Sequence, residues 1–409
     1  MSTKNVAILF GGKSVEHEVS IVTAREVFGA IDRSRYTPVP VYVNREGKWM
    51  SGSRLNQVMD DESYRSAFAK ASVQSVLEPH LDEVVLLPVP GIGGLLEMGS
   101  TQRQNISARL NALGSENRKL LPVDVFLPVF HGTFGEDGCM QGLFELADVA
   151  YTGCNVLASA VGMNKHFTKQ LLQVNGVESL PGILVRKSEL KDFDRLQTKI
   201  VGKLPMPLFV KPCNLGSSVG ISELSIVDSE DKLASALANV FRFDEAAIIE
   251  PYLTNLRELQ LAVCRGKTLH ASAVEAPKVQ GINTASAKYG TDMLSSGTKD
   301  SRRAGLSNAL REFDPKDLSA DILKQVARTA ERVYDILGCS GVVRVDFFYD
   351  TMNGRLLFNE INSLPGSLSY FLFERRTPPL LFTDLLTILI GSALDTHAAR
   401  DNYKRTHMF

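Results

Sequence analysis

Residues 340–363 read SGVVRVDFFYDTMNGRLLFNEINS, and this segment constrains the fold more tightly than any other part of the chain. Two runs of alternating apolar and polar residues flank Asn353-Gly354, a dipeptide typical of tight hairpin turns. The segment therefore predicts two antiparallel strands. Folding about the turn places Asp346 close to opposite Glu360, within one residue of register.

The polar side chains of this hairpin are expected to share a face, because successive side chains of a strand point to opposite sides. The outgoing strand contributes Arg344, Asp346 and Phe348, and the return strand contributes Phe358, Glu360 and Asn362. Facing carboxylates repel each other unless a cation lies between them. Carboxylate and amide oxygens favour magnesium or manganese over zinc. These oxygens therefore form a candidate metal site, and an ordinary solvated polar face is the alternative.

A second candidate site lies in residues 207–222, PLFVKPCNLGSSVGIS, which predict a strand, a glycine-rich loop and another strand. Lys211 ends an apolar run and cannot be buried without a partner, so we expect it to face an anion. Backbone N–H groups and hydroxyls of such a loop can bind a phosphate. The candidates are Gly216, Ser217, Ser218 and Gly220. A plain hairpin without a ligand is the alternative.

Two further stretches place acids beside predicted strands. Glu250 follows the buried run AAII, and Glu258 lies further along. Either could bind an adenine amino group or a ribose hydroxyl, and either could instead be a solvated acid. Near the N-terminus, residues 6–20 read VAILFGGKSVEHEVS but lack the glycine spacing of a P-loop or of a dinucleotide fingerprint. The sequence therefore gives only weak support for a phosphate loop after this first strand, and the role of Glu16 is left open at this point.

The chain of 409 residues is too long for one ordinary core, so two or three domains are expected. Apolar runs at 5–10, 37–43, 83–89 and 123–130 predict strands, and residues 19–32 predict a helix. This alternation is typical of βα units and a parallel sheet. Residues 90–119 are expected to form a surface excursion, whereas residues 152–176 and 321–338 have helical patterns.

Charge and cysteine content exclude several classes of protein. The net charge of −1 provides no basic surface for nucleic acid, and no long apolar run predicts a membrane span or an export signal. The five cysteines are scattered without a C-x-x-C pair, which indicates reduced thiols in a cytoplasmic protein. We therefore expect small-molecule partners, with no nucleic acid and no membrane.

Eight motifs in order resemble the D-alanine–D-alanine ligase family, within the ATP-grasp fold. They are GGKSVEHEVS, HGTFGEDGCMQG, MNKHFTK, FVKPCNLGSSVGIS, IIEPYL, AKYG, GCSGVVRVDFF and NEINSLPGS. The match runs from Val6 to about Leu372, and leaves residues 45–122 and the last twenty residues unmatched. The resemblance implies an α/β ATP-grasp protein with an N-terminal Rossmann-like parallel-sheet domain. The implied units are residues 1–157 for substrate binding, 158–248 for the central ATP-grasp subdomain and 249–409 for the C-terminal subdomain.

The resemblance also implies roles for individual residues. ATP would be bound by Lys165, Lys211, Ser218, Glu250, Leu253, Glu258 and Lys288. Two magnesium or manganese ions would be held by Asp346, Glu360 and Asn362. Glu16 would bind the ammonium group of the first D-alanine in a network with Ser217 and Tyr289. His131 would lie beside that site, while Arg344 and the Gly366 amide would stabilise the tetrahedral intermediate.

The implied reaction joins two D-alanine molecules at the expense of ATP, through an acyl phosphate, for peptidoglycan precursors. The acyl phosphate must be protected from water, and the long polar stretch 279–305 is expected to be a lid. The family also implies a cytoplasmic homodimer. One alternative is a ligase that joins D-alanine or another amino acid to a different amine or hydroxy acid. Another is a nucleotide-binding descendant without catalysis.

Three positions depart from the family pattern. Asn164 stands where the helix motif usually has Asp, and Pro251 stands where the adenine-binding strand often has Lys. Phe371 replaces a serine that usually binds the carboxylate of the second substrate. An aromatic ring cannot donate a strong hydrogen bond, so we expect another donor, such as a backbone N–H or the hydroxyl of Ser367 or Ser369. D-Alanine is expected at both sites, and Phe371→Ser is expected to lower the second Michaelis constant.

Overall fold

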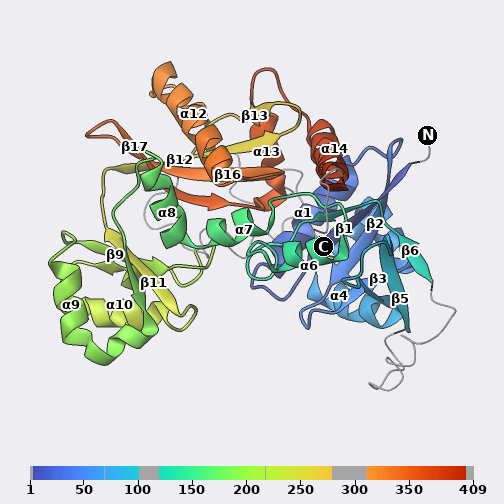
Figure 1. Ribbon diagram of the computed structural model, residues 1–409, viewed down its shortest axis with the longest axis horizontal. Coiled ribbons are helices and arrows are strands. Elements are labelled where there is room, and N and C mark those ends of the chain that lie inside the picture. The colour runs from blue at the N-terminus through green and yellow to red at the C-terminus, as the bar shows by residue number, and fades with distance from the viewer. Residues whose placement is uncertain (1–2, 69, 101–118, 217, 279–310, 402–409) are drawn as a thin grey trace, which may run out of the picture.

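The computed structural model describes residues 3–68, 70–100, 119–216, 218–278 and 311–401, which form an α/β protein with three β-sheets (Figure 1). The sheets follow one another along the chain. In the described parts of the chain they contain seven, four and six strands. This arrangement fits the ATP-grasp class that the motifs imply.

The first sheet has the strand order β6-β5-β4-β3-β2-β1-β7. Its strands are β1 (Lys4–Gly11), β2 (Tyr36–Val43), β3 (Trp49–Ser51), β4 (Asp82–Val85), β5 (Gly94–Ser100), β6 (Leu120–Pro122) and β7 (Val125–Pro128). The predicted parallel arrangement is correct only for β7, β1 and β2, since the other neighbours are antiparallel. A parallel pair needs a crossover of a dozen or more residues, so the short connections 44–48 and 86–93 lead to antiparallel neighbours.

Helices of this first part include the predicted one. They are α1 (His17–Ala30), α2 (Ser53–Asp60), α3 (Glu62–Ala67), α4 (Ala71–Leu77), the 3-10 helix η1 (Glu78–His80) and α6 (Cys139–Ala147). The prediction of a surface excursion at 90–119 is wrong where β5 pairs with β4 and β6. Residues 101–118 lie outside the described part of the chain.

Two short helices, α7 (Val156–Met163) and α8 (Lys165–Val174), lead to the second sheet. The sequence predicted one helix here, but Asn164 adopts an extended conformation, and its side chain accepts a hydrogen bond from the Phe167 N–H. Asn164 is therefore the N-cap of α8. Aspartate and asparagine are both strong N-cap residues, so this departure from the family pattern preserves the cap.

The second sheet is antiparallel, with the order β10-β9-β11-β8. Its elements are β8 (Ile183–Arg186), η3 (Lys187–Asp192), α9 (Phe193–Val201), β9 (Leu208–Pro212), η4 (Glu223–Ser225), β10 (Ile226–Val227), η5 (Glu230–Lys232), α10 (Leu233–Val240) and β11 (Ala246–Pro251). The strand predicted directly after the glycine-rich loop is wrong, because β10 begins only at Ile226. Since β11 crosses the boundary expected after residue 248, we propose that the central unit extends to Pro251.

The third sheet has the order β15-β14-β12-β16-β17, with β13 paired to β12. Its elements are β12 (Leu256–Arg265), β13 (Leu269–Ala271), β14 (Glu275–Pro277), β15 (Arg311–Phe313), α12 (Ala320–Ile336), β16 (Val342–Asp350), β17 (Arg355–Asn362), η9 (Gly366–Ser369), α13 (Tyr370–Phe373) and α14 (Phe382–Asp401). The predicted hairpin is confirmed as β16 and β17. The helix predicted at 321–338 is confirmed as α12.

One apolar core joins the first and third sheets. It contains Ile8 and Phe10 of β1, Val342 of β16, and Leu386 and Leu389 of α14, which lies beside the N-terminal sheet (Figure 1). A separate core packs α9 and α10 on the second sheet, and another lies under α12. Among the described helices, none combines the length and apolar character needed to cross a bilayer.

Candidate active site

The β16–β17 hairpin brings the predicted oxygen donors together. Asp346 pairs directly with Glu360, and Arg344 pairs with Asn362. The Arg344 guanidinium donates from Nε and Nη2 to the two Asp346 oxygens at 2.7 and 2.8 Å, and Asn362 Nδ2 donates to Asp346 Oδ2 at 3.3 Å. Asp346, Glu360 and Asn362 present carboxylate and amide oxygens on one face of the hairpin. This donor set fits a hard divalent cation such as magnesium.

A β-bulge on β17 changes the expected face of one residue. Asp346 pairs with Glu360, but the next residue, Phe347, pairs with Phe358, so Asn359 has no partner across the hairpin. Phe358 therefore points into the core, where its ring lies 6.4 Å from that of Phe347. The prediction that Phe358 shares the face of Glu360 is wrong. The bulge instead adds Asn359 to the site.

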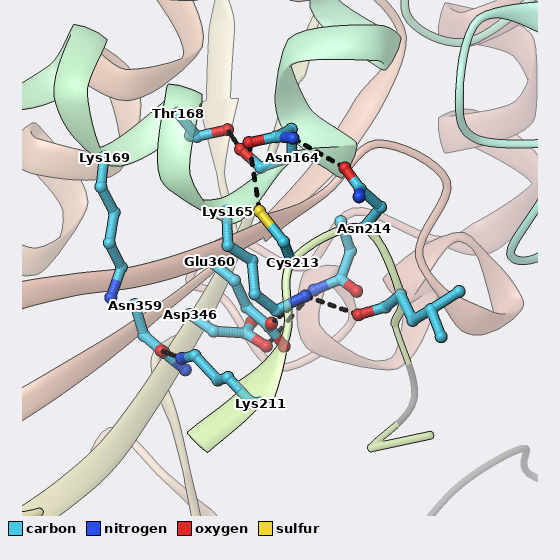
Figure 2. Close-up of polar contacts among 12 residues, drawn as sticks. Asn164, Lys165, Thr168, Lys169, Lys211, Cys213, Asn214, Asp346, Asn359 and Glu360 are labelled. Carbon is cyan, nitrogen blue, oxygen red and sulfur yellow. Dashed lines mark hydrogen bonds and ion pairs between the residues drawn. The ribbon is translucent and has the colours of Figure 1, made fainter. Parts of the chain in front are cut away.

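Two elements, α8 and β9, direct buried lysines at this hairpin (Figure 2). From the start of α8, Lys165 Nζ lies 3.2 Å from Glu360 Oε2 and donates to the Leu215 carbonyl at 2.6 Å. From β9, Lys211 Nζ lies 2.9 Å from Glu250 Oε2 of β11 and donates to Asn359 Oδ1 at 3.1 Å. The geometry thus joins four residues that the sequence singled out separately, namely Lys165, Lys211, Glu250 and Glu360.

Lys169, one turn after Lys165 on α8, forms an ion pair with Glu250, and both side chains are almost fully buried. Burial lowers the pKa of Lys169 to about 8, although the Glu250 charge opposes this shift. Burial alone would raise the pKa of Glu250. The positive charges of Lys169 and Lys211 have the larger combined effect and hold this pKa below its usual value. Sequence reasoning missed Lys169 as a site residue, although its spacing of four residues from Lys165 put both on one helix face.

A cavity of about 490 Å³ opens above these side chains. Its walls come from the second and third sheets and from α8. The predicted residues that line it are Lys165, Lys211, Ser218, Glu250, Leu253, Glu258 and Glu360, and its further lining includes Phe209, Pro251, Arg257, Pro277 and Asn359. The structure therefore gathers the described residues of the expected nucleotide site around one space. Lys288 lies outside the described residues.

A second cluster lies at the end of β1, where Glu16 precedes α1. The ligand atoms of Glu16, His131 and Glu136 all lie within 4.8 Å of one another, and all three side chains are buried. An ideal Cβ built on Gly216 would lie 3.8 Å from Glu16 Oε1, so the glycine-rich loop of the second sheet approaches this cluster. Ser217 and Tyr289, expected to act with Glu16, lie outside the described residues.

His131 links the first sheet to the turn that follows β17. Because a carbonyl only accepts, His131 Nδ1 carries the proton and donates to the Leu364 carbonyl at 3.0 Å. The other ring nitrogen, Nε2, lies 3.1 Å from Thr23 Oγ1. Burial, supported by the charge of Arg344, lowers the pKa of His131 to about 4. His131 is therefore neutral at pH 7.

Glu136 is a second functional candidate that sequence reasoning did not select. It accepts a hydrogen bond from the Gly132 N–H at 2.6 Å. Burial first, and then the charge of nearby Glu16, raise the pKa of Glu136 well above its usual value. Glu136 therefore takes up a proton more readily than an ordinary glutamate. The acids of the motif HGTFGEDG could have indicated this residue, but sequence alone does not show which acid is buried.

The turn after β17 has an unusual backbone. Gly366 begins η9, and Ser367, Leu368 and Ser369 all have φ near +50°, a left-handed conformation that costs energy for residues other than glycine. The Ser367 N–H donates to Thr23 Oγ1 at 3.0 Å, which ties the turn to α1. Ser367 and Ser369 are fully buried, so neither expected hydroxyl donor opens to solvent.

Comparison with known proteins identifies the family. Residues 5–154 match the family described as D-ala D-ala ligase N-terminus, and residues 171–391 match D-ala D-ala ligase C-terminus. The first match includes the segment 45–122, to which no motif could be assigned. The chain is 35% identical over 407 residues to D-alanine–D-alanine ligase A of Bradyrhizobium diazoefficiens, which covers 98% of this chain and 97% of that protein.

Solved structures agree with this comparison. The D-alanine–D-alanine ligase of Coxiella burnetii has a TM-score of 0.72 and 25% identity, and covers 98% of this chain and 97% of that one. The VanG D-Ala:D-Ser ligase of Enterococcus faecalis has a TM-score of 0.71 and 27% identity, and covers 96% of this chain and 100% of that one. The order of the motifs, the three sheets and these similarities lead to one conclusion. The chain belongs to the D-alanine–D-alanine ligase family.

Proposed function

We propose that this protein joins two D-alanine molecules in an ATP-dependent reaction that supplies a peptidoglycan precursor. The observation that carries the proposal is the convergence of Lys165 and Lys211 on the Asp346–Glu360 hairpin beneath a nucleotide-sized cavity. A carboxylate is a poor electrophile, so it must first become an acyl phosphate before an amine can attack it. Phosphoryl transfer needs positive charge around the transferring group.

The site residues that the structure describes have proposed roles in these reaction steps. Lys165 and Lys211 bind the phosphates of ATP, while Glu250, Leu253 and Glu258 bind its adenine and ribose. Asp346, Glu360 and Asn362 hold two magnesium or manganese ions, which offset the charge of the triphosphate when bound. Ser218 and, beyond the described residues, Lys288 complete the nucleotide site.

The second cluster would bind the first D-alanine. Glu16 supplies the negative charge for its ammonium group, in the network proposed with Ser217 and Tyr289, and neutral His131 lies beside it. Arg344 and the Gly366 amide stabilise the tetrahedral intermediate that forms when the second amine attacks the acyl carbon. The bond from that carbon to the phosphate oxygen then breaks, and phosphate leaves.

The test measures ADP release and D-alanyl-D-alanine formation, with and without D-alanine. Glu360→Gln should abolish ADP formation while the fold remains intact by circular dichroism, because the variant loses one ionised oxygen donor. Glu245→Gln is the matched control, since Glu245 is an exposed glutamate whose partner is Lys187. If Glu360→Gln keeps most of its activity at low magnesium, the metal assignment is wrong.

The alternative of a different second substrate has one observation in its favour, namely that Phe371 is buried where the family usually has serine. A panel of D-amino acids and D-hydroxy acids in the same assay addresses it, and we expect D-alanine to be preferred. We also propose that the protein acts as a cytoplasmic homodimer, which analytical ultracentrifugation can test. A monomer at micromolar concentration would contradict that proposal.

A further inference from the structure

Arg311, the first residue of β15, is an arginine that the fold buries. Its side chain is only 7% exposed, and its Nε lies 3.5 Å from Glu275 Oε1 of β14, which is 1% exposed. Its guanidinium carbon lies 4.2 Å from the centre of the Phe371 ring. Burying a charge is costly unless it is paired, and a guanidinium over an aromatic face gains further stabilisation. Glu275 and Phe371 thus both help to orient this cation.

The register of the third sheet places this group on the face that carries the site. Asp346 of β16 pairs with Gln260 of β12, and Gln260 pairs with Glu275 of β14. Directly paired residues point to the same side of a sheet, so Glu275 and Asp346 share a face. Their strands are two positions apart, which corresponds to about 10 Å at the usual spacing. The Arg311 guanidinium, which pairs with Glu275, therefore belongs to the face of the sheet that carries the proposed reaction centre.

The electrostatics of Glu275 indicate the same proximity. Burial raises the pKa of Glu275 above its usual value, while Arg311 and Arg344 both lower it and Asp346 raises it. The buried Glu275 carboxyl is thus close enough to Arg311, Arg344 and Asp346 for the charges of all three to affect its pKa. A planar guanidinium has five donors and can bind a further carboxylate in addition to its first partner.

The position of Arg311 differs from that of the lysines. Lys165 and Lys211 contact Glu360 and Asn359 on β17, at one edge of the sheet, whereas Arg311 lies on β15, at the opposite edge. Arg344 of β16 lies between them. Since the lysines are proposed to bind phosphate, Arg311 lies on the side of Arg344 that faces away from the proposed phosphate site.

We propose that Arg311 binds the carboxylate of the second amino acid, with Glu275 and the ring of Phe371 holding its guanidinium in place. The inference rests on the proposed function, because it concerns the amine that attacks the acyl phosphate. It also accounts for Phe371: the ring cannot donate a strong hydrogen bond to a carboxylate, but it provides the surface on which a stronger donor lies. The proposal reverses the expectation drawn from the sequence, because Phe371→Ser also removes the ring and should then raise the second Michaelis constant. The substrate class is an α-amino acid whose carboxylate is free.

The test separates binding of the second substrate from the earlier steps. Hydroxylamine can replace the second D-alanine as the nucleophile, and the product, D-alanyl hydroxamate, forms without any second carboxylate. Arg311→Gln should raise the Michaelis constant for the second D-alanine roughly ten- to hundred-fold, the loss expected for a charge-assisted hydrogen bond. Hydroxamate formation should stay within about twofold of the parent. Arg311→Lys should restore part of the loss.

D-Alaninamide, which lacks the free carboxylate, is a second test substrate. The preference for D-alanine over D-alaninamide would not change if Arg311 had a purely structural role. The parent should prefer D-alanine to D-alaninamide as the second substrate, and Arg311→Gln should remove most of this preference. The matched control is Arg265→Gln, because Arg265 also contacts an aspartate and lies 5.4 Å from a tyrosine ring, but on the α12 side of the sheet. This control should leave both Michaelis constants unchanged.

The outcomes distinguish failure of the proposed ligase function from failure of the proposal about Arg311. If the parent forms no hydroxamate with ATP and D-alanine, the proposed function fails. If hydroxamate forms but Arg311→Gln leaves the second Michaelis constant and the preference over D-alaninamide unchanged, the inference about Arg311 is overturned. Should Arg311→Gln fail to fold, Phe371→Leu replaces it. Loss of the ring should raise the second Michaelis constant several-fold with hydroxamate formation retained, and an unchanged constant would refute the proposal.

Discussion

The buried ion pair of Lys169 and Glu250 illustrates how a single residue can control a binding site without touching its ligand. Lys211 also contacts Glu250, and we propose that it turns to phosphate when ATP binds. Lys169 would then be the remaining neighbour that neutralises Glu250. Removing one partner of a buried pair costs about 3–5 kcal/mol. Lys169→Met should therefore lower the free energy of unfolding by about that amount and weaken ATP binding, as measured by urea unfolding and ATP titration.

The double variant Lys169→Met/Glu250→Gln provides the control for this prediction. It removes both charges, so part of the lost stability should return. ATP binding should not return, because Glu250 is itself proposed to contact the nucleotide. If the double variant is less stable than Lys169→Met, the pair is not the source of the effect.

His131 predicts a dependence of stability on pH. Its pKa is about 4 in the folded protein, below the ordinary 6.5, so the unfolded state binds more protons between these values. The contribution is fully present above pH 6.5 and is lost as the pH falls towards 4. It amounts to roughly 3 kcal/mol. Unfolding free energies at pH 7 and pH 4.5 should therefore differ less for His131→Gln than for the parent, and an equal difference would contradict the assignment.

At this scale the sequence predicted the residues whose position follows from alternation or spacing. Asp346 and Glu360 could be placed opposite each other from the hairpin alone. Asn359 could not, because a bulge leaves no signal in a pattern of alternating residues. Lys169 and Glu136 needed knowledge of burial, which depends on contacts between distant segments. Residue type alone does not show whether a charge is solvated.

At the scale of elements, the start of α8 determines where Lys165 points. Asn164 caps the helix, and Lys165 is its first residue. Asn164→Asp should keep both the cap and ATP affinity, because both residues accept the Phe167 N–H hydrogen bond. Asn164→Ala should cost about 1 kcal/mol of stability and weaken ATP binding as Lys165 loses its fixed position. Equal ATP dissociation constants for the two variants, from calorimetric titration, would contradict this role of the cap.

The bulge on β17 leads to a second prediction at this scale. Asn359→Ala removes the acceptor that holds Lys211 and should weaken ATP binding about tenfold, the loss of one hydrogen bond to a charged group. The magnesium dependence of the reaction should be unchanged, because Asp346 and Glu360 pair independently of the bulged residue. Asn353→Ala, in the turn of the same hairpin, is the matched control and should leave ATP binding as in the parent.

Helices and strands were predicted well where the apolar residues follow a single helical or strand periodicity. The α1 and α12 helices and the β16–β17 hairpin follow directly from their patterns. The parallel sheet was predicted only in part, because short apolar runs do not show whether the next strand returns by a hairpin or a crossover. The break between α7 and α8 was missed because a single capping residue interrupts an otherwise continuous helical pattern.

At the scale of the whole molecule, the first and third sheets share one apolar core, whereas the second sheet has its own. Leu386 of α14 and Leu237 of α10 are both fully buried, one in each core. Substituting either by alanine should cost about 2–5 kcal/mol. Leu386→Ala should reduce hydrogen-exchange protection in β1 and β12 together. Leu237→Ala should reduce it only in β8, β9 and β11.

The two variants serve as controls for each other, since the chemical change is the same. If Leu386→Ala reduced protection in the third sheet alone, the shared core would not act as one cooperative unit. Uniform loss of protection in both variants would instead indicate that all three sheets unfold together.

The shared core also has a consequence for the order in which the chain is made. Strand β7 ends at Pro128, but α14, which covers the same core, begins only at Phe382. A ribosome adding 5–20 residues per second needs on the order of 10–50 s to synthesise the intervening chain. During that interval the apolar surface that α14 later covers stays exposed on the nascent N-terminal sheet. The last helix of the described residues is therefore the one that lets the first sheet become stable, so the nascent chain depends on protection from aggregation until α14 has been made.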